Sequence, residues 1–358
     1  MVYLEFRKFF QLIFLVNLFV SSLLGQQLGS QLLNPANKIV KQMGTYRFVE
    51  GPAADSLGNV YFSDITDNKI YLWKVTGEVS LFRSNTAAGN GLYFDKNSNL
   101  LVCHGTSQKI TSISPSGIES VIADSIGGKP LNSPNDLWVE PANGVYFTDP
   151  RYSSGALPAV LGFHVYYISA DRKSITRVIS DLTKPNGIIG TPDGKTLYVA
   201  DPGANKIFSY NIIGSGQLSG KKQFAPEGAD GMTLDELGNV YLCNGNSISV
   251  YQPSGGLLGK IPFPENPVNA TFGGANGNTL FVAANTGIYT LQMEVKGSLP
   301  ISNPSSIRFQ IEKRKLFSQI KNQVFFNGHR IQIFGDGKVM DGKVIERKLI
   351  DGIGRYSN

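Results

Sequence analysis

The chain of 358 residues is short of several residue types, and each shortage excludes a class of protein. It has 2 cysteines and 3 histidines, too few for a disulfide-built scaffold and in no spacing typical of zinc ligands. Charged residues make up 17% of the chain and apolar residues 41%, a balance that excludes a disordered protein. No stretch has strong helical periodicity. A β-rich globular protein fits best, and 40 glycines suit its many turns.

Two widespread catalytic motifs are also missing. No Gly-x-Ser-x-Gly segment is present, so the nucleophilic serine of the α/β-hydrolases is not expected. Ser215 stands where a phosphate-binding loop ending in Gly220-Lys221 would need its first glycine. Serine hydrolysis and nucleotide hydrolysis are therefore disfavoured.

Six similar units follow one another along the chain, and each begins with a polar residue at the start of an apolar strand. These starts, called here the inner ring, are Glu50, Asn90, Asn135, Asn186, Asp230 and Asn269. A second polar residue ends the next strand 14, 14, 14, 15, 14 and 16 residues later. These ends, called here the outer ring, are Asp64, His104, Asp149, Asp201, Asn244 and Asn285.

Each unit contains the signals of four strands. A cluster of Gly, Asn or Asp predicts a hairpin between the first two strands, as in Asp55-Ser-Leu-Gly-Asn59. An alternating strand such as Lys206-Ile-Phe-Ser-Tyr210 comes next, followed by a shorter apolar run. Four strands repeating every 40 to 50 residues or so are typical of propeller blades. The sequence predicts an all-β fold, a six-bladed β-propeller over residues 38–296, with a β-sandwich as the alternative.

Three features of the predicted propeller follow from this arrangement. The stretch 38–48 is a candidate fourth strand for the last blade, which would close the circle. The inner ring should converge on one mouth of the central channel, with the outer ring around it. Cys103 and Cys243 end strands in opposite blades, so they cannot reach the Cα separation of about 7 Å that a disulfide allows. Both are predicted to be buried free thiols.

The two ends of the chain differ from the propeller in composition. Residues 1–25 combine Arg7 and Lys8 with an apolar run and small residues, the layout of a secretory signal peptide cleaved near Gly25. A membrane anchor is the alternative, but the run is short and contains polar residues, so no stable membrane span is expected. The protein is therefore expected to be secreted, periplasmic or otherwise extracytoplasmic.

Residues 297–358 form a basic C-terminal extension of unknown role and unknown partner. They hold 11 Lys and Arg against 5 Asp and Glu, whereas the rest of the chain holds 22 of each kind. Within the extension, the segment 324–333 has the pattern of a hairpin. Because the propeller part is neutral and has no nucleic-acid-binding motif, no nucleic-acid partner is expected.

The inner ring has the chemistry of a cation site. Glu50 and Asp230 offer carboxylates, and Asn135 and Asn186 offer amide oxygens, which together suit a hard divalent cation such as Ca²⁺. Zn²⁺, Mg²⁺ and Mn²⁺ are the alternatives. A single Asn or Asp before a glycine is usually only a turn residue, so the prediction depends on all six occupying one structural position.

Five segments resemble the gluconolactonase, regucalcin and senescence-marker-protein family, and the resemblance extends over about residues 40–295. They are Val49-Glu-Gly-Pro52, Leu131-Asn-Ser-Pro-Asn-Asp136, Phe147-Thr-Asp-Pro150, Lys184-Pro-Asn-Gly-Ile188 and Ala229-Asp-Gly-Met232. The family implies a six-bladed propeller with one catalytic divalent metal on its axis. Carried over by motif, Glu50, Asn186 and Asp230 are expected metal ligands, and Asn135 lies at the metal or the substrate. Ser133 replaces the family's substrate-binding arginine.

The function implied is metal-dependent hydrolysis of a sugar lactone. The cation would polarise the lactone carbonyl, and a carboxylate would act as general base for the attacking water. Asp230 is the expected base, with Asp149 and Asp201 as outer-ring alternatives that could also contact the substrate. Arg151 and His104 are candidates for orienting its hydroxyl groups. The competing hypotheses are a phosphotriesterase like the squid-type diisopropyl fluorophosphatase, and a non-enzymatic binding propeller.

Overall fold

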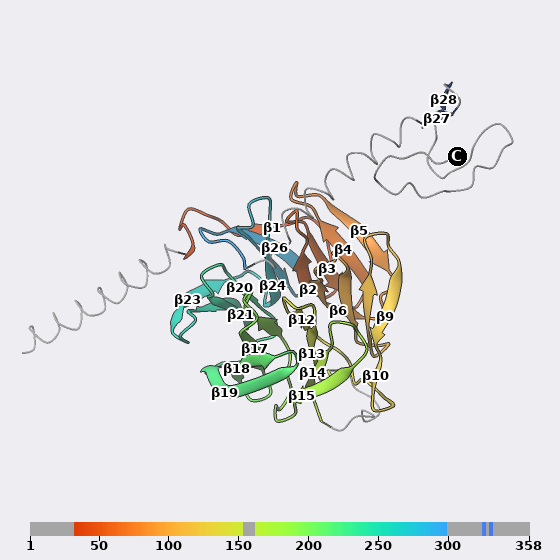
Figure 1. The fold of residues 1–358 in the computed structure, drawn as a ribbon. Coiled ribbons are helices and arrows are strands. Elements are labelled where there is room, and N and C mark those ends of the chain that lie inside the picture. The colour runs from red at the N-terminus through yellow and green to blue at the C-terminus, as the bar shows by residue number, and fades with distance from the viewer. Residues whose placement is uncertain (1–31, 153–161, 299–323, 327–328, 332–358) are drawn as a thin grey trace, which may run out of the picture. The chain divides into compact units, whose positions relative to one another are not determined.

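The computed structural model describes residues 32–152, 162–298, 324–326 and 329–331. Within these ranges the named elements are strands, and six sheets of four antiparallel strands each make up residues 40–292. Figure 1 shows these sheets arranged in a circle around a central axis. The prediction of a six-bladed propeller is confirmed, and the β-sandwich alternative is wrong because the sheets do not form two facing layers.

The blades are listed from the innermost strand outward. Blade 1 contains β2 (Val49–Ala54), β3 (Val60–Asp64), β4 (Lys69–Trp73) and β5 (Val79–Ser84); blade 2 contains β6 (Gly89–Phe94), β7 (Leu100–His104), β8 (Lys109–Ile113) and β9 (Glu119–Ala123). Blade 3 contains β12 (Leu137–Val139), β13 (Val145–Asp149), β14 (His164–Ile168) and β15 (Ile175–Ile179); blade 4 contains β16 (Ile188–Gly190), β17 (Thr196–Asp201), β18 (Lys206–Gly214) and β19 (Gln217–Ala225). Blade 5 contains β20 (Met232–Leu234), β21 (Val240–Asn244), β22 (Ser247–Tyr251) and β23 (Leu257–Pro262); blade 6 contains β24 (Pro267–Gly273), β25 (Thr279–Ala284), β26 (Gly287–Gln292) and β1 (Val40–Lys41). A small hairpin, β10 (Ser125–Ile126) and β11 (Lys129–Pro130), connects blades 2 and 3.

The circle is closed by β1, the first strand of the chain, which pairs with β26 of the last blade. Val40 lies opposite Thr290 and Lys41 opposite Tyr289 in an antiparallel register. The backbone N–H of Gln42 extends this pairing with a hydrogen bond to the Ile288 carbonyl at 2.8 Å. The expectation that the stretch 38–48 completes the last blade is confirmed.

The hairpin between the first and second strands is shaped by an aspartate in three blades. In blade 1, Oδ1 of Asp55 accepts the backbone N–H groups of Leu57 at 2.8 Å and Asn59 at 3.0 Å. Its Oδ2 accepts the Asn59 side-chain amide at 3.0 Å. Asp95 and Asp235 repeat this pattern. Because a short hairpin joins the first two strands of every blade, the distance from the inner to the outer ring stays nearly constant along the sequence.

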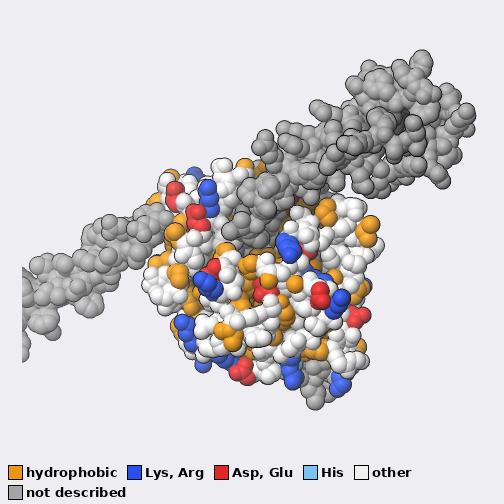
Figure 2. Space-filling view, viewed as in Figure 1, with side chains coloured by type: hydrophobic (Ala, Val, Ile, Leu, Met, Phe, Trp, Pro, Cys, Tyr) orange, Lys and Arg blue, Asp and Glu red, His pale blue; other side chains and the backbone are white. Residues whose placement is uncertain are grey.

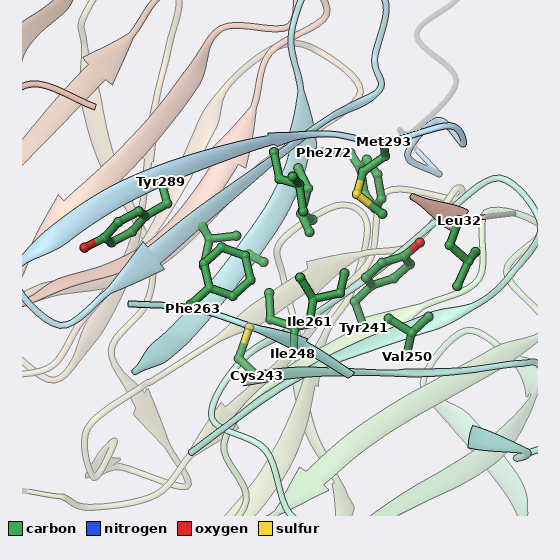
Figure 3. Packing of buried hydrophobic residues seen from close by; sticks show 14 of the residues in the cluster. Leu32, Tyr241, Cys243, Ile248, Val250, Ile261, Phe263, Phe272, Tyr289 and Met293 are labelled. Atoms are coloured by element: carbon green, nitrogen blue, oxygen red, sulfur yellow. The ribbon is translucent and has the colours of Figure 1, made fainter. Parts of the chain in front are cut away.

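Apolar side chains fill the spaces between neighbouring blades. In Figure 3, residues from blade 5 and blade 6 pack against one another, among them Tyr241, Ile248 and Phe272. The rings of Tyr241 and Phe272 meet edge to face with centroids 5.3 Å apart. Each such side chain contributes roughly 1.5–3 kcal/mol when it is fully buried. Contacts between blades therefore hold the circle together.

Both cysteines are buried free thiols, as predicted. Cys103 lies on β7 of blade 2 and Cys243 on β21 of blade 5. Burial raises the pKa of both thiols well above the ordinary value. A buried thiol that stays protonated is a poor nucleophile and metal ligand.

The predicted signal segment, residues 1–25, lies outside the described residues. The chain divides into two compact units, residues 1–301 and 302–358. At the end of the first unit, Gly297 and Ser298 hydrogen-bond to blade 6 and blade 5 through the carbonyls of Gly277 and Leu234. In the second, the structure describes one hairpin, β27 (Val324–Phe326) and β28 (His329–Ile331). Within the described ranges, no helix has the length and apolar character that a membrane crossing needs.

Charge is mixed on the propeller surface. Figure 2 shows Lys and Arg interspersed with Asp and Glu over the visible face of the propeller. This agrees with the equal numbers of acidic and basic residues outside positions 297–358.

Candidate active site at the inner ring

The inner ring lies where the innermost strands begin. Glu50 is in β2, while Asn135, Asn186 and Asp230 each stand two residues before their strands β12, β16 and β20. Glu50, Asn135 and Asn186 are buried and Asp230 is half-buried. The structure thus places all four predicted metal ligands at corresponding positions of blades 1, 3, 4 and 5.

Backbone hydrogen bonds connect these positions from one blade to the next. The N–H of Gly91 donates to the Asn135 carbonyl at 2.8 Å, and the N–H of Gly187 donates to the Asp230 carbonyl at 2.7 Å. The N–H of Gly231 continues the series to Val268 of blade 6 at 2.7 Å. Neighbouring blades are therefore in direct backbone contact at the inner ring, which brings its side chains together.

The glycine after an inner-ring residue makes this contact sterically feasible. A Cβ atom at Gly91 would lie 2.6 Å from the Asn135 carbonyl oxygen, and one at Gly231 would lie 2.1 Å from Cγ of Asn269. Contacts that short do not occur, so a side chain would force the blades apart. The recurring Asn-Gly and Asp-Gly pairs thus reflect close packing around the axis.

Side chains of the inner ring bind one another across blades. The Asn186 amide donates from Nδ2 to Oδ1 of Asp230 at 2.6 Å, joining blade 4 to blade 5. The Asn269 amide donates to Oε2 of Glu50 at 3.2 Å, and the Gly51 N–H donates to the same oxygen at 2.8 Å. Both carboxylates are oriented by donors on one side.

Both acids have raised pKa values in the absence of a cation. Burial raises the pKa of Glu50 well above its ordinary range, and the nearby carboxylates of Asp230 and Asp136 raise it further. Burial also raises the pKa of Asp230 to about 6, against the lowering effect of the Asn186 hydrogen bond. Burial and mutual repulsion disfavour the ionised forms of these acids, and a bound cation would stabilise those ionised forms strongly.

One acidic residue of the axis, Asp136, was not among the predicted site residues. It takes the place that glycine occupies in the corresponding pairs such as Asn186-Gly187. Its Oδ1 accepts the Leu137 N–H at 2.9 Å, and its side chain lines an axial cavity of ≈ 50 Å³. Burial raises its pKa to about 7, with a further contribution from Asp230. Four inner-ring residues are followed by glycine and Asn269 by alanine, so the acid after Asn135 was the available signal.

The aspartates of the outer ring are bound by backbone donors. The two carboxylate oxygens of Asp149 accept the N–H groups of Asn132 and Ser133, both at 2.8 Å. Asp201 accepts those of Thr183 and Lys184 in the same way, also at 2.8 Å. In blade 1, Asp64 accepts the N–H groups at positions 47 and 48 at 2.9 and 3.2 Å. Each carboxylate fixes the segment that leads into an inner-ring residue of its own blade.

The other two candidates also lie in contacts within the protein. His104 is buried, with Nδ1 2.5 Å from the Thr86 carbonyl oxygen and Nε2 2.7 Å from Oγ1 of Thr111. Burial lowers the pKa of His104, which favours the neutral ring. Arg151 is half-buried just after β13 and interacts within the protein. The structure therefore does not bring His104, Asp149 or Asp201 together with the inner ring as free side chains.

The inner ring fits a hard divalent cation. In the described part of the chain, no three His, Cys, Asp or Glu side chains gather as a metal site. A cation held here would therefore depend on the amide oxygens of Asn135 and Asn186 beside two carboxylates. Oxygen donors of this kind suit Ca²⁺ better than Zn²⁺, which prefers nitrogen and sulfur ligands. The Asn186 amide turns its nitrogen toward Asp230, so its oxygen is not used in that bond.

Comparison with known proteins places the chain among lactonase-like propellers. Residues 48–286 match the family described as the SMP-30/Gluconolactonase/LRE-like region. A gluconolactonase of Zymomonas mobilis is 27% identical over 282 residues, covering 69% of this chain and 79% of that protein.

Two solved structures share the fold. A gluconolactonase from Xanthomonas campestris superposes with a TM-score of 0.69 at 28% identity, covering 74% of this chain and 92% of that one. The calcium-binding protein regucalcin from Agrobacterium tumefaciens superposes with a TM-score of 0.61 at 18% identity, covering 72% of this chain and 93% of that one. Since the family match extends over most of the propeller, the chain belongs to the SMP-30/Gluconolactonase/LRE-like family.

Proposed function

We propose that this protein is a divalent-cation-dependent lactonase that hydrolyses a sugar lactone. The observation that carries the proposal is the inner ring, where Glu50 and Asp230 lie with Asn135 and Asn186 at the blade starts and both acids have raised pKa values. The relatives named gluconolactonase support the choice of substrate class.

Glu50, Asn186 and Asp230 would hold the cation, and Asn135 would complete the site at the cation or the substrate. When bound, a divalent cation polarises the lactone carbonyl and stabilises the negative charge that develops on its oxygen. Glu50 is suited to this task because Gly51 and Asn269 both donate to Oε2, which fixes the carboxylate and leaves its other oxygen for a ligand. We expect Ca²⁺ from the oxygen-only donor set.

Asp230 is the proposed general base. Its Oδ1 accepts the Asn186 amide at 2.6 Å, so the carboxylate is held in one orientation. Its other oxygen can then take a proton from the water that attacks the carbonyl carbon. The proton is passed on to the ring oxygen that leaves when the carbonyl carbon–oxygen bond breaks. The product is the open hydroxy acid.

Metal removal and reconstitution test this function. Purified protein would be stripped with a chelator, dialysed, and assayed with Ca²⁺, Mg²⁺, Mn²⁺ or Zn²⁺ on a panel of γ- and δ-lactones and one phosphotriester. Lactone hydrolysis lost on stripping and restored by one cation, most strongly by Ca²⁺, is the expected result. Full activity of metal-free protein, or turnover of the phosphotriester without turnover of any lactone, would contradict it.

A further inference from the structure

Lys184 and Ser133 occupy the same structural position in neighbouring blades. Each stands two residues before an inner-ring asparagine and is followed by proline. The N–H of Ser133 donates to Oδ1 of Asp149, and the N–H of Lys184 donates to Oδ1 of Asp201, both at 2.8 Å. The Ser133 hydroxyl donates to the Gly105 carbonyl at 3.2 Å. Blade 4 therefore presents a long cationic side chain where blade 3 has a short, internally bonded hydroxyl.

The ammonium group of Lys184 lies over an aromatic ring of the neighbouring blade. Its Nζ is 4.1 Å from the centroid of the Tyr152 ring, which comes from the segment after β13. Tyr152 is 47% exposed, so part of the residue is open to solvent. Burial of its hydroxyl and the Asp230 carboxylate raise the Tyr152 pKa, whereas interaction with the Asn186 side chain lowers it. Tyr152 thus interacts with two inner-ring residues, Asp230 and Asn186.

Lys184 differs from the other lysines that lie over aromatic rings. Lys41 lies 5.5 Å from the Tyr289 centroid and also forms a salt bridge with Glu265 at 2.7 Å. Lys221 lies 4.4 Å from the centroid of the Phe208 ring and forms a salt bridge with Asp181, also at 2.7 Å. Among the described residues, Lys184 has no carboxylate within salt-bridge distance. The stretch 153–161, which follows Tyr152, contains no Asp or Glu.

We propose that Lys184 and Tyr152 recognise an oxyanion carried by the substrate, a carboxylate or phosphate at the end remote from the lactone carbonyl. The proposal rests on the proposed lactonase function, since it places the lactone carbonyl at the inner ring. Lys184 supplies a charge-assisted hydrogen bond to the oxyanion, and the Tyr152 hydroxyl binds a neighbouring substrate oxygen. The substrate class is then an acidic sugar lactone.

Binding of hydrolysis products tests the proposal without depending on turnover. Gluconate, 6-phosphogluconate and glucarate share a terminal carboxylate and differ at the remote end, which carries a hydroxyl, a phosphate or a carboxylate. Their affinities for the Ca²⁺-loaded full-length protein would be measured by calorimetry. We expect at least one of the two ligands with an anionic remote end to bind about tenfold or more tightly than gluconate. Comparison of the phosphate with the carboxylate identifies the oxyanion.

Variants assign the preference to the two side chains. Lys184→Met should abolish the preference while leaving gluconate affinity within about twofold, and Lys184→Arg should restore most of it. Tyr152→Phe should weaken all three ligands by a smaller factor, since a neutral hydrogen bond contributes less. Lys221→Met is the matched control, because it removes a lysine that also lies over a ring but has its own carboxylate partner. It should bind like the wild-type protein.

The two proposals fail in different ways. Equal wild-type affinity for all three products, or an equal loss for all three in Lys184→Met, overturns the recognition role. If the preference depends on Lys184 but no lactone is hydrolysed under any cation, the recognition role stands and the lactonase function fails. If lactones are hydrolysed without any preference for acidic ones, the lactonase function stands and the recognition role fails. Thermal unfolding of each variant separates loss of binding from loss of folding.

Discussion

The inner and outer rings are alike in sequence and different in chemistry. Both consist of six polar residues with regular spacing, and most members of both are buried. In the outer ring, the carboxylates of Asp64, Asp149 and Asp201 are each occupied by two or more backbone N–H groups of their own blade. In the inner ring, side chains such as Asn186 and Asp230 bind each other across blades.

The difference shows what a repeated polar residue can and cannot indicate. Spacing fixes where a side chain lies, because a short hairpin joins the first two strands of each blade. It does not fix whether the oxygen atoms of that side chain are already used. An oxygen that accepts a backbone N–H satisfies a buried donor that would otherwise be destabilising, so it is part of the fold. Only oxygens left over after this requirement can bind a cation or a substrate.

The largest effect is expected from Asp230→Asn. The change keeps the size and one ligand oxygen of the side chain but removes its charge and its basicity. Lactone turnover at saturating Ca²⁺ should fall by about 10² to 10⁴-fold, with weaker metal binding adding to the loss. Steady-state kinetics measure the effect, and a circular dichroism spectrum and an unfolding curve check that the propeller is intact. Retention of more than about a tenth of wild-type turnover would remove Asp230 from the role of base.

Asp64→Asn in the outer ring is expected to lower the stability of the protein and to leave its turnover nearly unchanged. The amide can accept only on one side, so a backbone N–H at position 47 or 48 loses its acceptor. Leaving a buried donor unpaired costs about 1–3 kcal/mol, and the free energy of unfolding should fall by that amount. Turnover of the folded variant should stay within about threefold of wild type. Urea unfolding and activity at low denaturant measure both, and a large loss of turnover without loss of stability would show that the outer ring takes part in catalysis.

A smaller and pH-dependent effect follows from the raised pKa values at the axis. The pKa of Asp230 is raised from 3.8 to about 6 and that of Asp136 from 3.8 to about 7. For such acids the stabilising contribution is complete below the unfolded value and is lost as the pH rises through the folded value. With chelator present, the protein should therefore become less stable between about pH 4 and pH 7, by at least about 1 kcal/mol.

Added Ca²⁺ should restore the stability that the metal-free protein loses as the pH rises to about 7. Below about pH 6 a proton on Asp230 competes with the cation, so calcium affinity should fall as the pH is lowered. Thermal unfolding at pH 5 and pH 8, with chelator and with Ca²⁺, gives the four values needed. Asp136→Asn is the control, since it should reduce the pH dependence of the metal-free protein. A metal-free stability that rises steadily from pH 5 to pH 8 would contradict the assignment.

The architecture could be predicted from sequence because its determinants are local. Alternating apolar residues, turn residues and their fixed spacing define each blade without knowledge of the rest of the chain. The closing strand β1 could be predicted because the last unit lacked a fourth strand, and the separation of Cys103 from Cys243 followed from blade order. These features need only the count and order of the strands.

The roles of individual side chains were harder to predict because they depend on residues distant in sequence. The spacing of Asp149 gave no sign that two N–H groups from residues 132 and 133 occupy its carboxylate. Asp136 was missed because it sits next to a ring residue where glycine is the rule. The pairing of Tyr152 with Lys184 joins two blades, so neither segment alone indicates it. A side chain's function depends on which of its atoms remain unbound, and that is a three-dimensional property.

The smallest effect is expected from Asn90→Ala, the test that compares members within the inner ring. Asn90 is an asparagine at the start of its blade, as Asn135 is, yet the family resemblance gives no ligand in its blade. Its backbone carbonyl accepts the Ser63 hydroxyl at 2.7 Å, a contact that survives removal of the side chain. Stability should therefore change by no more than about 0.5 kcal/mol, and turnover should stay within about threefold of wild type. Asn135→Ala is the matched comparison and should lower turnover much further. Equal losses in both variants, measured with the same lactone at saturating Ca²⁺, would mean that all six positions act alike and that the cation site is not confined to blades 1, 3, 4 and 5.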